Sequence, residues 1–362
     1  MFLGFGEIMM RVTPEGFLRF RQVLPGRMEC TFGGAEANVC VALAAFGAPV
    51  RYLTALPENP IAEALATDLR GRGVDTSAIL HRDAGRLGIY FLELGANQRP
   101  SVVVYDRAGS AIAQAEPDEY DLDAALDGVS WVHTTGITPS LSENAFLATL
   151  KLVQAAKERG CTVSCDMNYR KKLWKWRPGT AQQALAGECM SQIFQYVDLS
   201  VGNEEDAAKV FGIEAAGTSV EEGKIAAAAY EQVARTIIER FPTISRVAIT
   251  LRESLSASHN NWGGMLYDRE ADRAFFAPLG ADGDYQPYEI RNIVDRVGGG
   301  DSFAAGLLFA LNSDEYAEPQ DAIRFAVAAS CLKHSLRGDF LCIAADEVVS
   351  LMEGSGTGRV KR

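Results

Sequence analysis

Residues 294–303 read VDRVGGGDSF, and the three consecutive glycines of this stretch precede an apolar helical run at 303–311. Glycine lets backbone N–H groups turn inward without a Cβ clash, and the N-terminus of a helix adds its positive end. The stretch therefore predicts an anion cradle. Asp301, however, places a carboxylate where the anion would lie, so these residues alone slightly favour a plain N-cap after a tight glycine turn.

Two further features lie upstream of this turn. A glycine pair in FGGAEAN, residues 32–38, opens a helix that runs to Phe46, although paired glycines also precede many helices that only pack in a core. Arginines lie beside aromatic residues in YDR, residues 105–107, and in DMNYR, residues 166–170. The planar guanidinium suits a carboxylate or a phosphate, but a surface ion pair explains most single arginines.

Strand-like and helix-like segments alternate along most of the chain. The N-terminal MFLGFGE reads as a first strand and not as a signal peptide, and further strands are predicted at 51–56, 131–135, 162–166, 197–201 and 247–251. Longer segments with helical periodicity lie between them, such as 142–159 and 225–241. This alternation predicts an α/β fold with a mostly parallel sheet that helices cover on both faces.

Two early segments, 8–32 and 86–115, break this alternation, because they read as strands and turns with little helix between them. They are expected to pair into a small accessory sheet. At about 150 residues per domain, 362 residues suggest two domains, but no long linker or internal repeat divides the chain. We therefore expect one α/β domain over 1–362, with the accessory strands inserted into it.

The composition is that of an ordinary globular protein, with 48% apolar and 23% charged residues. The formal charge of −12 argues against nucleic acid or an anionic membrane as a partner, but it allows an anionic small substrate that meets a few local cations. Apolar runs are far shorter than the ~20 residues of a membrane span. Seven cysteines without a CxxC pair predict free thiols and a reducing cytoplasm.

Several common active sites are absent from the sequence. It contains no GxxxxGK[ST] loop, no HExxH and no GxSxG, and its four histidines lack the spacing of metal ligands. A GxGxxG motif does not follow the first strand, which disfavours a dehydrogenase.

Taken together in this order, the glycine motifs resemble those of the ribokinase-like (PfkB) sugar kinases. GGAEANVCVALAAFG, residues 33–47, is similar to the N-terminal signature of that family, and DRVGGGDSFAAG, residues 295–306, to its C-terminal signature. The resemblance covers nearly the whole chain. It implies a three-layer α/β/α domain with a mostly parallel sheet and a small β-sheet lid.

Within this family the chain most resembles the 2-keto-3-deoxygluconate kinases. The segments that carry this finer resemblance are VVVYDRAGSA at 102–111, CDMNYR at 165–170, GNEED at 202–206 and KHSLRGDF at 333–340. The resemblance implies that Asp301 is the catalytic base and that the N–H groups of Gly298, Gly299, Gly300 and Asp301 form an anion hole for the transferred phosphoryl group. Such a transfer needs positioning and charge stabilisation more than covalent help.

The resemblance also implies which residues meet the sugar and the nucleotide. Besides Asp301, the sugar-binding residues would be Gly34, Asn38, Tyr90, Tyr105, Arg107, Arg170 and Asp339. On the nucleotide side they would be Asn203, Thr250, Arg252, Gly298 and Gly300. No metal ligand is assigned, but Asp206, at the last position of an N-x-x-E-like motif, is a candidate for a water-mediated contact with Mg²⁺.

The sequence departs from the family pattern at several of these positions. Arg252 stands where the family has a K-x-G turn, and Val327 lies near a position that often carries a polar adenine contact, so no polar contact with adenine is assigned there. Gly299 replaces an alanine, which loosens the turn but keeps its donor. Arg296 replaces a threonine or serine, which alters any monovalent-cation site near Asp295.

The resemblance implies an ATP-dependent kinase that phosphorylates the C6 hydroxyl of 2-keto-3-deoxygluconate, with Mg²⁺ accompanying ATP. A sugar acid explains why Arg107 and Arg170 converge where a neutral sugar would need no cation. A PfkB kinase for a neutral sugar such as fructose or ribose, and a non-catalytic sugar-binding regulator of the same fold, remain alternatives. Lid strands that pair between subunits in this family imply a homodimer or higher homo-oligomer.

Overall fold

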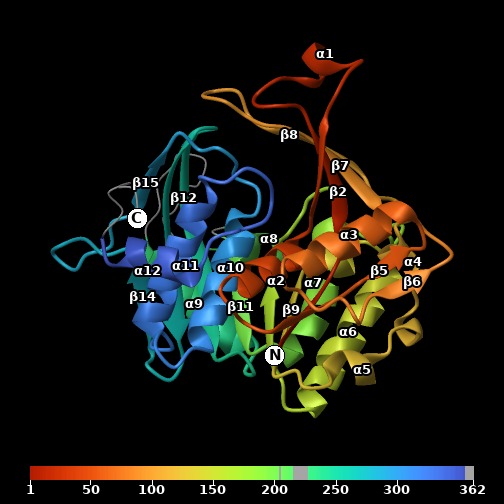
Figure 1. The fold of residues 1–362 in the computed structure, drawn as a ribbon. Coiled ribbons are helices and arrows are strands. Elements are labelled where there is room, and N and C mark those ends of the chain that lie inside the picture. Colours follow the sequence, from red (N-terminus) through yellow and green to blue (C-terminus); the bar gives the residue numbers. More distant parts are fainter. Residues whose placement is uncertain (204, 215–226, 355–362) are drawn as a thin grey trace.

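The computed structural model describes residues 1–203, 205–214 and 227–354. Within these ranges nine strands form the main sheet, in the order β14-β13-β12-β11-β10-β9-β1-β4 with β15 paired to β13 (Figure 1). The strands are β1 (Phe2–Phe5), β4 (Val50–Leu53), β9 (Trp131–Thr135), β10 (Thr162–Asp166), β11 (Leu199–Asn203), β12 (Arg246–Ser256), β13 (His259–Asp268), β14 (Arg273–Ala277) and β15 (Tyr288–Arg291). Those from β12 through β4 are parallel, and β13, β14 and β15 extend one edge in antiparallel pairing.

Helices cover both faces of this sheet, because successive strand residues are buried on opposite sides. In β1, Phe2 belongs to one apolar cluster and Leu3 to the other. The first cluster contains residues of α2 (Ala35–Ala45), α3 (Pro60–Gly71), α10 (Gly299–Leu311), α11 (Pro319–Lys333) and α12 (Ala345–Met352). The second contains residues of α4 (Ala111–Gln114), α5 (Leu122–Leu126), α6 (Glu143–Glu158), α7 (Gln182–Ile193), α8 (Asp206–Phe211) and α9 (Ala227–Arg240). The predicted three-layer α/β/α architecture is confirmed.

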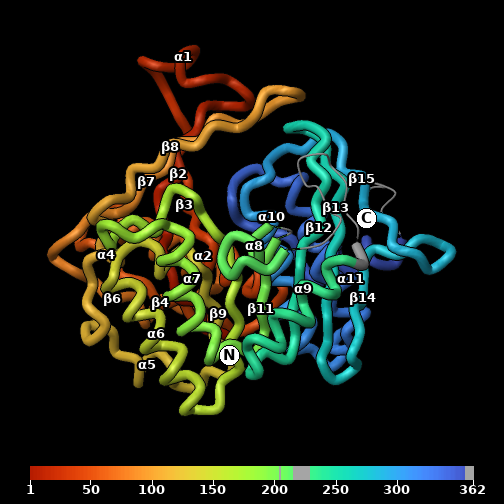
Figure 2. Tube along the Cα trace, turned by 180° about the vertical axis from the view of Figure 1, so that it is seen from behind, coloured from red at the N-terminus to blue at the C-terminus, as the bar shows by residue number. Residues whose placement is uncertain are grey.

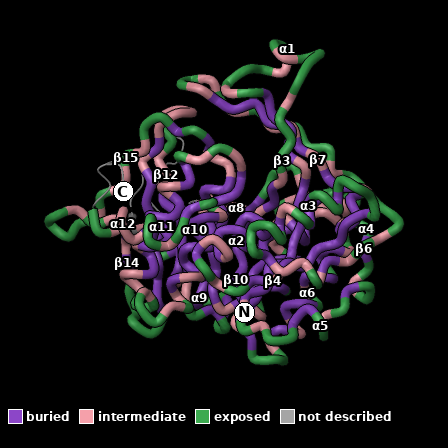
Figure 3. Tube along the Cα trace, in the orientation of Figure 1, coloured by how far each residue is buried: buried purple, intermediate pink, exposed green. Residues whose placement is uncertain are grey.

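A second sheet rises from the main body at the top of Figure 1, and Figure 2 shows it from behind. Its order is β3-β2-β7-β8, with β2 (Met9–Thr13), β3 (Glu29–Gly33), β7 (Gly88–Glu93) and β8 (Val102–Asp106). The parallel pairing of β2 with β7 joins the two segments whose pairing the sequence predicts. The short helix α1 (Phe20–Val23) lies in the connection from β2 to β3, and none of its residues is buried (Figure 3).

One predicted strand is wrong in its extent. The segment 51–56 does not form one strand, because β4 ends at Leu53 and β5 (Ala55–Pro57) pairs with β6 (Leu80–Arg82) in a separate two-stranded sheet. The break lies at Thr54, whose carbonyl accepts a hydrogen bond from the Leu80 N–H at 2.9 Å. The chain therefore leaves the main sheet one residue before β5 begins.

The other predicted elements shift by only a few residues. The helix expected at 142–159 is α6, whose N-cap Ser142 accepts a hydrogen bond from the Ala145 N–H at 3.0 Å. The helix expected at 225–241 is α9, and its first two predicted residues lie outside the described ranges. All seven cysteines are free, as predicted. Among the described helices, none has the length and apolar character to span a membrane.

Candidate active site

The carboxyl ends of the parallel strands open into a cavity of about 470 Å³ beneath the smaller sheet. Crevices at this edge of an open parallel sheet are the usual ligand sites of α/β folds. Glu7 follows β1, Ile137 follows β9, and Asn203 ends β11, and all three line the cavity. The wall also contains every site residue that the sequence predicts, namely Gly34, Asn38, Tyr90, Tyr105, Arg107, Arg170, Asn203, Asp206, Thr250, Arg252, Gly298, Gly299, Gly300, Asp301 and Asp339.

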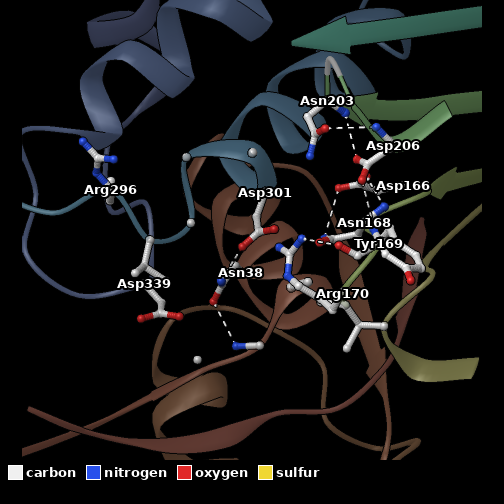
Figure 4. Close-up of a pocket in the computed structure, with 18 of the residues that line it drawn as sticks. Asn38, Asp166, Asn168, Tyr169, Arg170, Asn203, Asp206, Arg296, Asp301 and Asp339 are labelled. Carbon is white, nitrogen blue, oxygen red and sulfur yellow. Dashed lines mark hydrogen bonds between the residues drawn. The ribbon is translucent and has the colours of Figure 1, made fainter. Parts of the chain in front are cut away.

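Asp301 lies in the first turn of α10, where its carboxylate meets the side chain of Asn38 from α2. The Asn38 Nδ2 group donates to Asp301 Oδ2 at 2.6 Å (Figure 4). Burial raises the pKa of Asp301 to about 6, although this hydrogen bond opposes the shift. The N-cap of α10 is Gly298 and no side chain caps the helix, so the N-cap role that the local sequence slightly favours for Asp301 is wrong.

The glycine turn beside Asp301 requires glycine for two separate reasons. Gly298 has φ = 81°, in the left-handed region that side chains disfavour. A Cβ atom on Gly298 would also lie 2.2 Å from the carbonyl oxygen of Asp339. The N–H groups in the first turn of a helix lack intrahelical partners, so this end of α10 can receive an anion.

Glu36 lies in the first turn of α2, and its carboxylate binds the end of a strand of the main sheet. Its Oε1 accepts hydrogen bonds from the backbone N–H and the hydroxyl of Thr135, at 3.1 and 2.8 Å, and from Thr138 Oγ1 at 3.0 Å. Burial raises the pKa of Glu36 to about 7. These contacts tie the first turn of α2 to the end of β9 and thereby fix Asn38 in the cavity. Nothing in the local sequence distinguishes Glu36 from a surface glutamate.

Asp339 reaches the cavity from the loop after α11, and its carboxylate is held from the smaller sheet. Its Oδ1 accepts hydrogen bonds from Tyr90 Oη at 2.6 Å and from Arg11 Nη1 at 2.7 Å. Arg11 Nη2 donates to Asp295 Oδ2 at 2.5 Å. Burial disfavours the charged guanidinium, but Asp295 and Asp339 more than compensate, so the pKa of Arg11 is raised. Sequence reasoning misses Arg11, although a charged residue inside the apolar strand β2 is a usable signal.

The two arginines that the sequence singles out have different surroundings. Arg107, which follows β8, forms an ion pair with the buried Glu7 carboxylate, and its guanidinium lies 5.5 Å from the centre of the Tyr105 ring. Arg170 lies in the loop after β10 and is exposed, and its Nη1 donates to the Tyr169 carbonyl at 3.2 Å. Both line the same cavity, but Arg107 forms a direct ion pair with a buried carboxylate, whereas the charge of Arg170 acts from nearby on the buried Asp166, Asp206 and Asp301, where it opposes the rise in pKa that burial causes.

Two buried carboxylates, those of Asp166 and Asp206, lie on the side of Asp301 that is away from Asp339 (Figure 4). Asp206 accepts hydrogen bonds from the backbone N–H groups of Tyr169 at 3.1 Å and Asn203 at 2.9 Å, so it joins the ends of β10 and β11. Burial and then the charges of Asp206 and Asp301 raise the pKa of Asp166 well above its usual range. Of the predicted N-x-x-E-like motif, Glu204 lies outside the described residues.

The neighbourhood of Asp295 bears on the monovalent cation that the resemblance allows. Arg296 Nη2 donates to the carbonyls of Ser256 and Ala257, both at 2.8 Å. Asp295 itself accepts hydrogen bonds from Arg11 and from the Gly338 N–H. Guanidinium and backbone N–H groups thus already donate to these oxygens, so a monovalent-cation site of the kind the resemblance allows would be altered here. Val327 is fully buried in the apolar core.

Comparison with known proteins supplies the family. The model of the pfkB family carbohydrate kinases matches residues 3–240. The 2-dehydro-3-deoxygalactonokinase of Haloferax volcanii is 32% identical over 354 residues, which cover 98% of this chain and 97% of that protein. The 2-dehydro-3-deoxygluconokinase of Thermoproteus tenax is 27% identical over 336 residues, which cover 90% and 88%.

A solved structure agrees with these sequence matches. The crystal structure of 2-dehydro-3-deoxygluconokinase from Thermotoga maritima has a TM-score of 0.87 and 40% identity, and the match covers 98% of this chain and 99% of that one. The chain belongs to the pfkB family of carbohydrate kinases, and it is a phosphotransferase with the ribokinase-like fold. The family predicted from the two glycine signatures is confirmed.

Proposed function

We propose that this chain transfers the γ-phosphoryl group of ATP to the C6 hydroxyl of 2-keto-3-deoxygluconate. The observation that carries the proposal is the Asp301 carboxylate, held by Asn38 at 2.6 Å beside the glycine-rich N-terminus of α10. A carboxylate at this place can take a proton while the adjacent N–H groups stabilise the phosphoryl oxygens. The names of the relatives support a 2-dehydro-3-deoxy sugar acid as the acceptor.

The reaction assigns one role to each part of the cavity. Asp301 accepts the proton of the sugar hydroxyl as its oxygen forms a bond to the γ-phosphorus. The bond from that phosphorus to the β,γ-bridging oxygen breaks, and ADP leaves with the electron pair. The N–H groups of residues 298–301 stabilise the charge on the transferred phosphoryl oxygens. Asn203, Thr250 and Arg252 bind the nucleotide in this proposal.

The sugar acid lies between the smaller sheet and α2. Gly34 and Asn38 contact its hydroxyls, and Tyr90, Tyr105 and Asp339 border it on the sheet side. Arg170 supplies the charge-assisted hydrogen bonds to its carboxylate. Arg107 assists but is partly neutralised, because Glu7 already forms an ion pair with it.

Asp166 and Asp206 are the groups that fit Mg²⁺. Burial raises the pKa of both carboxyls, and the charges of Asp206 and Asp301 raise that of Asp166 further, so a divalent cation would relieve the excess of negative charge around Asp166. Both Asp206 oxygens already accept backbone N–H groups, so its contact would pass through water. When bound, the ion supplies charge neutralisation to the ATP phosphates.

The smaller sheet is proposed as a lid of a single α/β domain that also pairs with a second copy of the chain. Val102 and Val104, which share one face of β8, are 39% and 51% exposed, and an unpaired exposed strand of this kind invites pairing with another chain. Val104→Asp should therefore yield a monomer by light scattering, while Leu147→Asp, at an equally exposed residue of α6, should not. A wild-type protein that is already a monomer would contradict the pairing.

A coupled ADP-release screen over ketodeoxy sugar acids and neutral hexoses tests the substrate. We expect turnover with 2-keto-3-deoxygluconate, and ³¹P and ¹³C spectra of the product should place the phosphate on C6. Faster turnover with the galactonate-derived epimer would replace the epimer in the proposal. Turnover only with fructose or ribose would overturn the sugar-acid assignment, and no turnover with any sugar would support a non-catalytic regulator.

A further inference from the structure

Arg11 belongs to the smaller sheet, yet its side chain ends beneath the glycine turn of the main domain. The residue has no exposed surface, and its two terminal nitrogens contact different loops. Nη1 donates to Asp339 Oδ1 at 2.7 Å, and Nη2 donates to Asp295 Oδ2 at 2.5 Å. Asp295 and Asp339 lie 284 and 328 residues away in the sequence. A single guanidinium therefore joins the sheet to two separate loops.

Both loops contact the glycine turn. Asp295 precedes Gly298 by three residues and accepts the Val297 N–H through Oδ1 at 3.1 Å. It also accepts the Gly338 N–H through Oδ2 at 3.2 Å, which holds the two loops together. The carbonyl of Asp339 lies against Gly298, where a Cβ atom would be only 2.2 Å away. Asp295, through its carboxylate, and Asp339, through its carbonyl, therefore both contact the backbone that forms the anion cradle or leads into it.

The smaller sheet holds Asp339 through two neighbouring strands. Arg11 in β2 and Tyr90 in β7 are direct partners in the parallel register, and both donate to the same oxygen, Asp339 Oδ1. Lys333 is also fully buried, and its charge acts on Asp295, Asp339 and Arg11. Two cations thus face two carboxylates without solvent. Such a cluster tolerates little independent movement of its members, because each displaced charge would lose its partner.

We propose that Arg11 is a positioning residue that couples the sugar-side sheet to the glycine turn. Under the proposed function, the sugar contacts Tyr90 and its neighbours, and the Arg11 cluster passes the resulting shift to residues 295–298. Binding of the sugar then favours the shape of the cradle that receives the γ-phosphate. The two substrates therefore bind with positive coupling, and Arg11 carries that coupling.

Calorimetric titration with a non-hydrolysable ATP analogue, with and without saturating sugar, measures the coupling. We expect the sugar to tighten nucleotide binding about 5-fold or more in the wild type, which is the lower end of typical coupling. Arg11→Lys keeps the charge, but one ammonium cannot replace the two-armed guanidinium, so the factor should fall close to one. Arg86→Lys is the matched control, since Arg86 pairs with Asp106 on the exposed side of the same sheet.

The variants separate coupling from simple folding damage. Nucleotide affinity without sugar should change less than 2-fold in Arg11→Lys, and the same coupling loss should appear in Asp295→Asn, which weakens the contact of Arg11 Nη2 at a residue that lines neither substrate site. If Arg11→Lys does not fold, Asp295→Asn decides. A wild-type factor of one, or full coupling in both variants, would overturn the proposal. The sugar used is whichever one the ADP-release screen identifies, so a wrong substrate assignment fails in that screen and not here.

Discussion

The helices that carry Asn38 and Asp301 are buried along most of their length, whereas β8 of the smaller sheet leaves Val102, Val104 and Tyr105 exposed. Both helices pack in the apolar cluster on one face of the main sheet, together with α11. The sheet contributes only a small apolar cluster around Tyr90 and Leu92. We call the two helices, α2 and α10, the floor of the cavity and the smaller sheet its cover. The floor is well packed, whereas few apolar contacts support the cover. We expect substitutions in the floor to lower kcat, and substitutions in the sheet to change binding and stability.

The largest effect is expected in the floor. Asp301→Asn should lower kcat by about 10²–10⁴, the usual contribution of a general base, with little change in the affinity for ATP. Because burial of the ionised carboxylate is unfavourable, as its raised pKa shows, the melting temperature at pH 8 should stay the same or rise. Steady-state kinetics and thermal unfolding check both points. A folded variant with normal kcat would remove Asp301 as the base.

Stability should respond most in the sheet. Arg107→Ala leaves the buried Glu7 carboxylate without its cation, which typically costs about 3–5 kcal/mol. The double variant Arg107→Ala/Glu7→Gln removes the unpaired charge and should regain most of the lost free energy of unfolding, while KM for the sugar stays raised. Urea unfolding of the three proteins measures this. Equal destabilisation of the single and double variants would show that the pair does not fix the sheet.

A substitution of Arg170 tests whether a residue of the main body can change the binding of the sugar acid without a change in catalysis. Removal of one charged hydrogen-bond partner costs about 1.5–3 kcal/mol, so Arg170→Ala should raise KM for the sugar acid tens-fold. KM for ATP should barely change. Lys171→Ala, at the adjacent exposed position, is the control and should leave both values unchanged. A loss of ATP affinity with an unchanged KM for the sugar would place Arg170 on the phosphate side.

The smallest effect concerns pH. Asp301 must be ionised to act as a base, so kcat/KM should fall as the pH decreases through about 6. The Asn38 hydrogen bond stabilises the carboxylate, and Asn38→Ala should therefore move this acid limb about one unit higher. Asn59→Ala, at the N-cap of α3, should leave the limb in place. An unshifted limb in Asn38→Ala would mean that another group controls it.

The glycine turn of the floor could be predicted from the sequence because its parts are contiguous, whereas its contact with Asn38 spans 263 residues. The glycines at 298–300 and Asp301 lie within four residues, and helix geometry alone brings them together. The cover could not be predicted in this way. The ion pair of Arg107 with Glu7 spans 100 residues, and the contact of Arg11 with Asp339 spans 328. Local patterns in the sequence therefore cannot predict these contacts. The strand break at Thr54 was likewise set by pairing with the distant Leu80.

The two apolar clusters on opposite faces of the main sheet support different residues of the cavity. Phe303, beside the base, packs in one cluster, and Met167 and Trp174, which flank Arg170, pack in the other. Repacking of the second cluster can therefore move Arg170 while α2 and α10, which carry Asn38 and Asp301, keep their packing in the first. In descendants of this chain the position of Arg170 can thus change while the Asn38–Asp301 hydrogen bond stays in place, because the main sheet separates the two clusters.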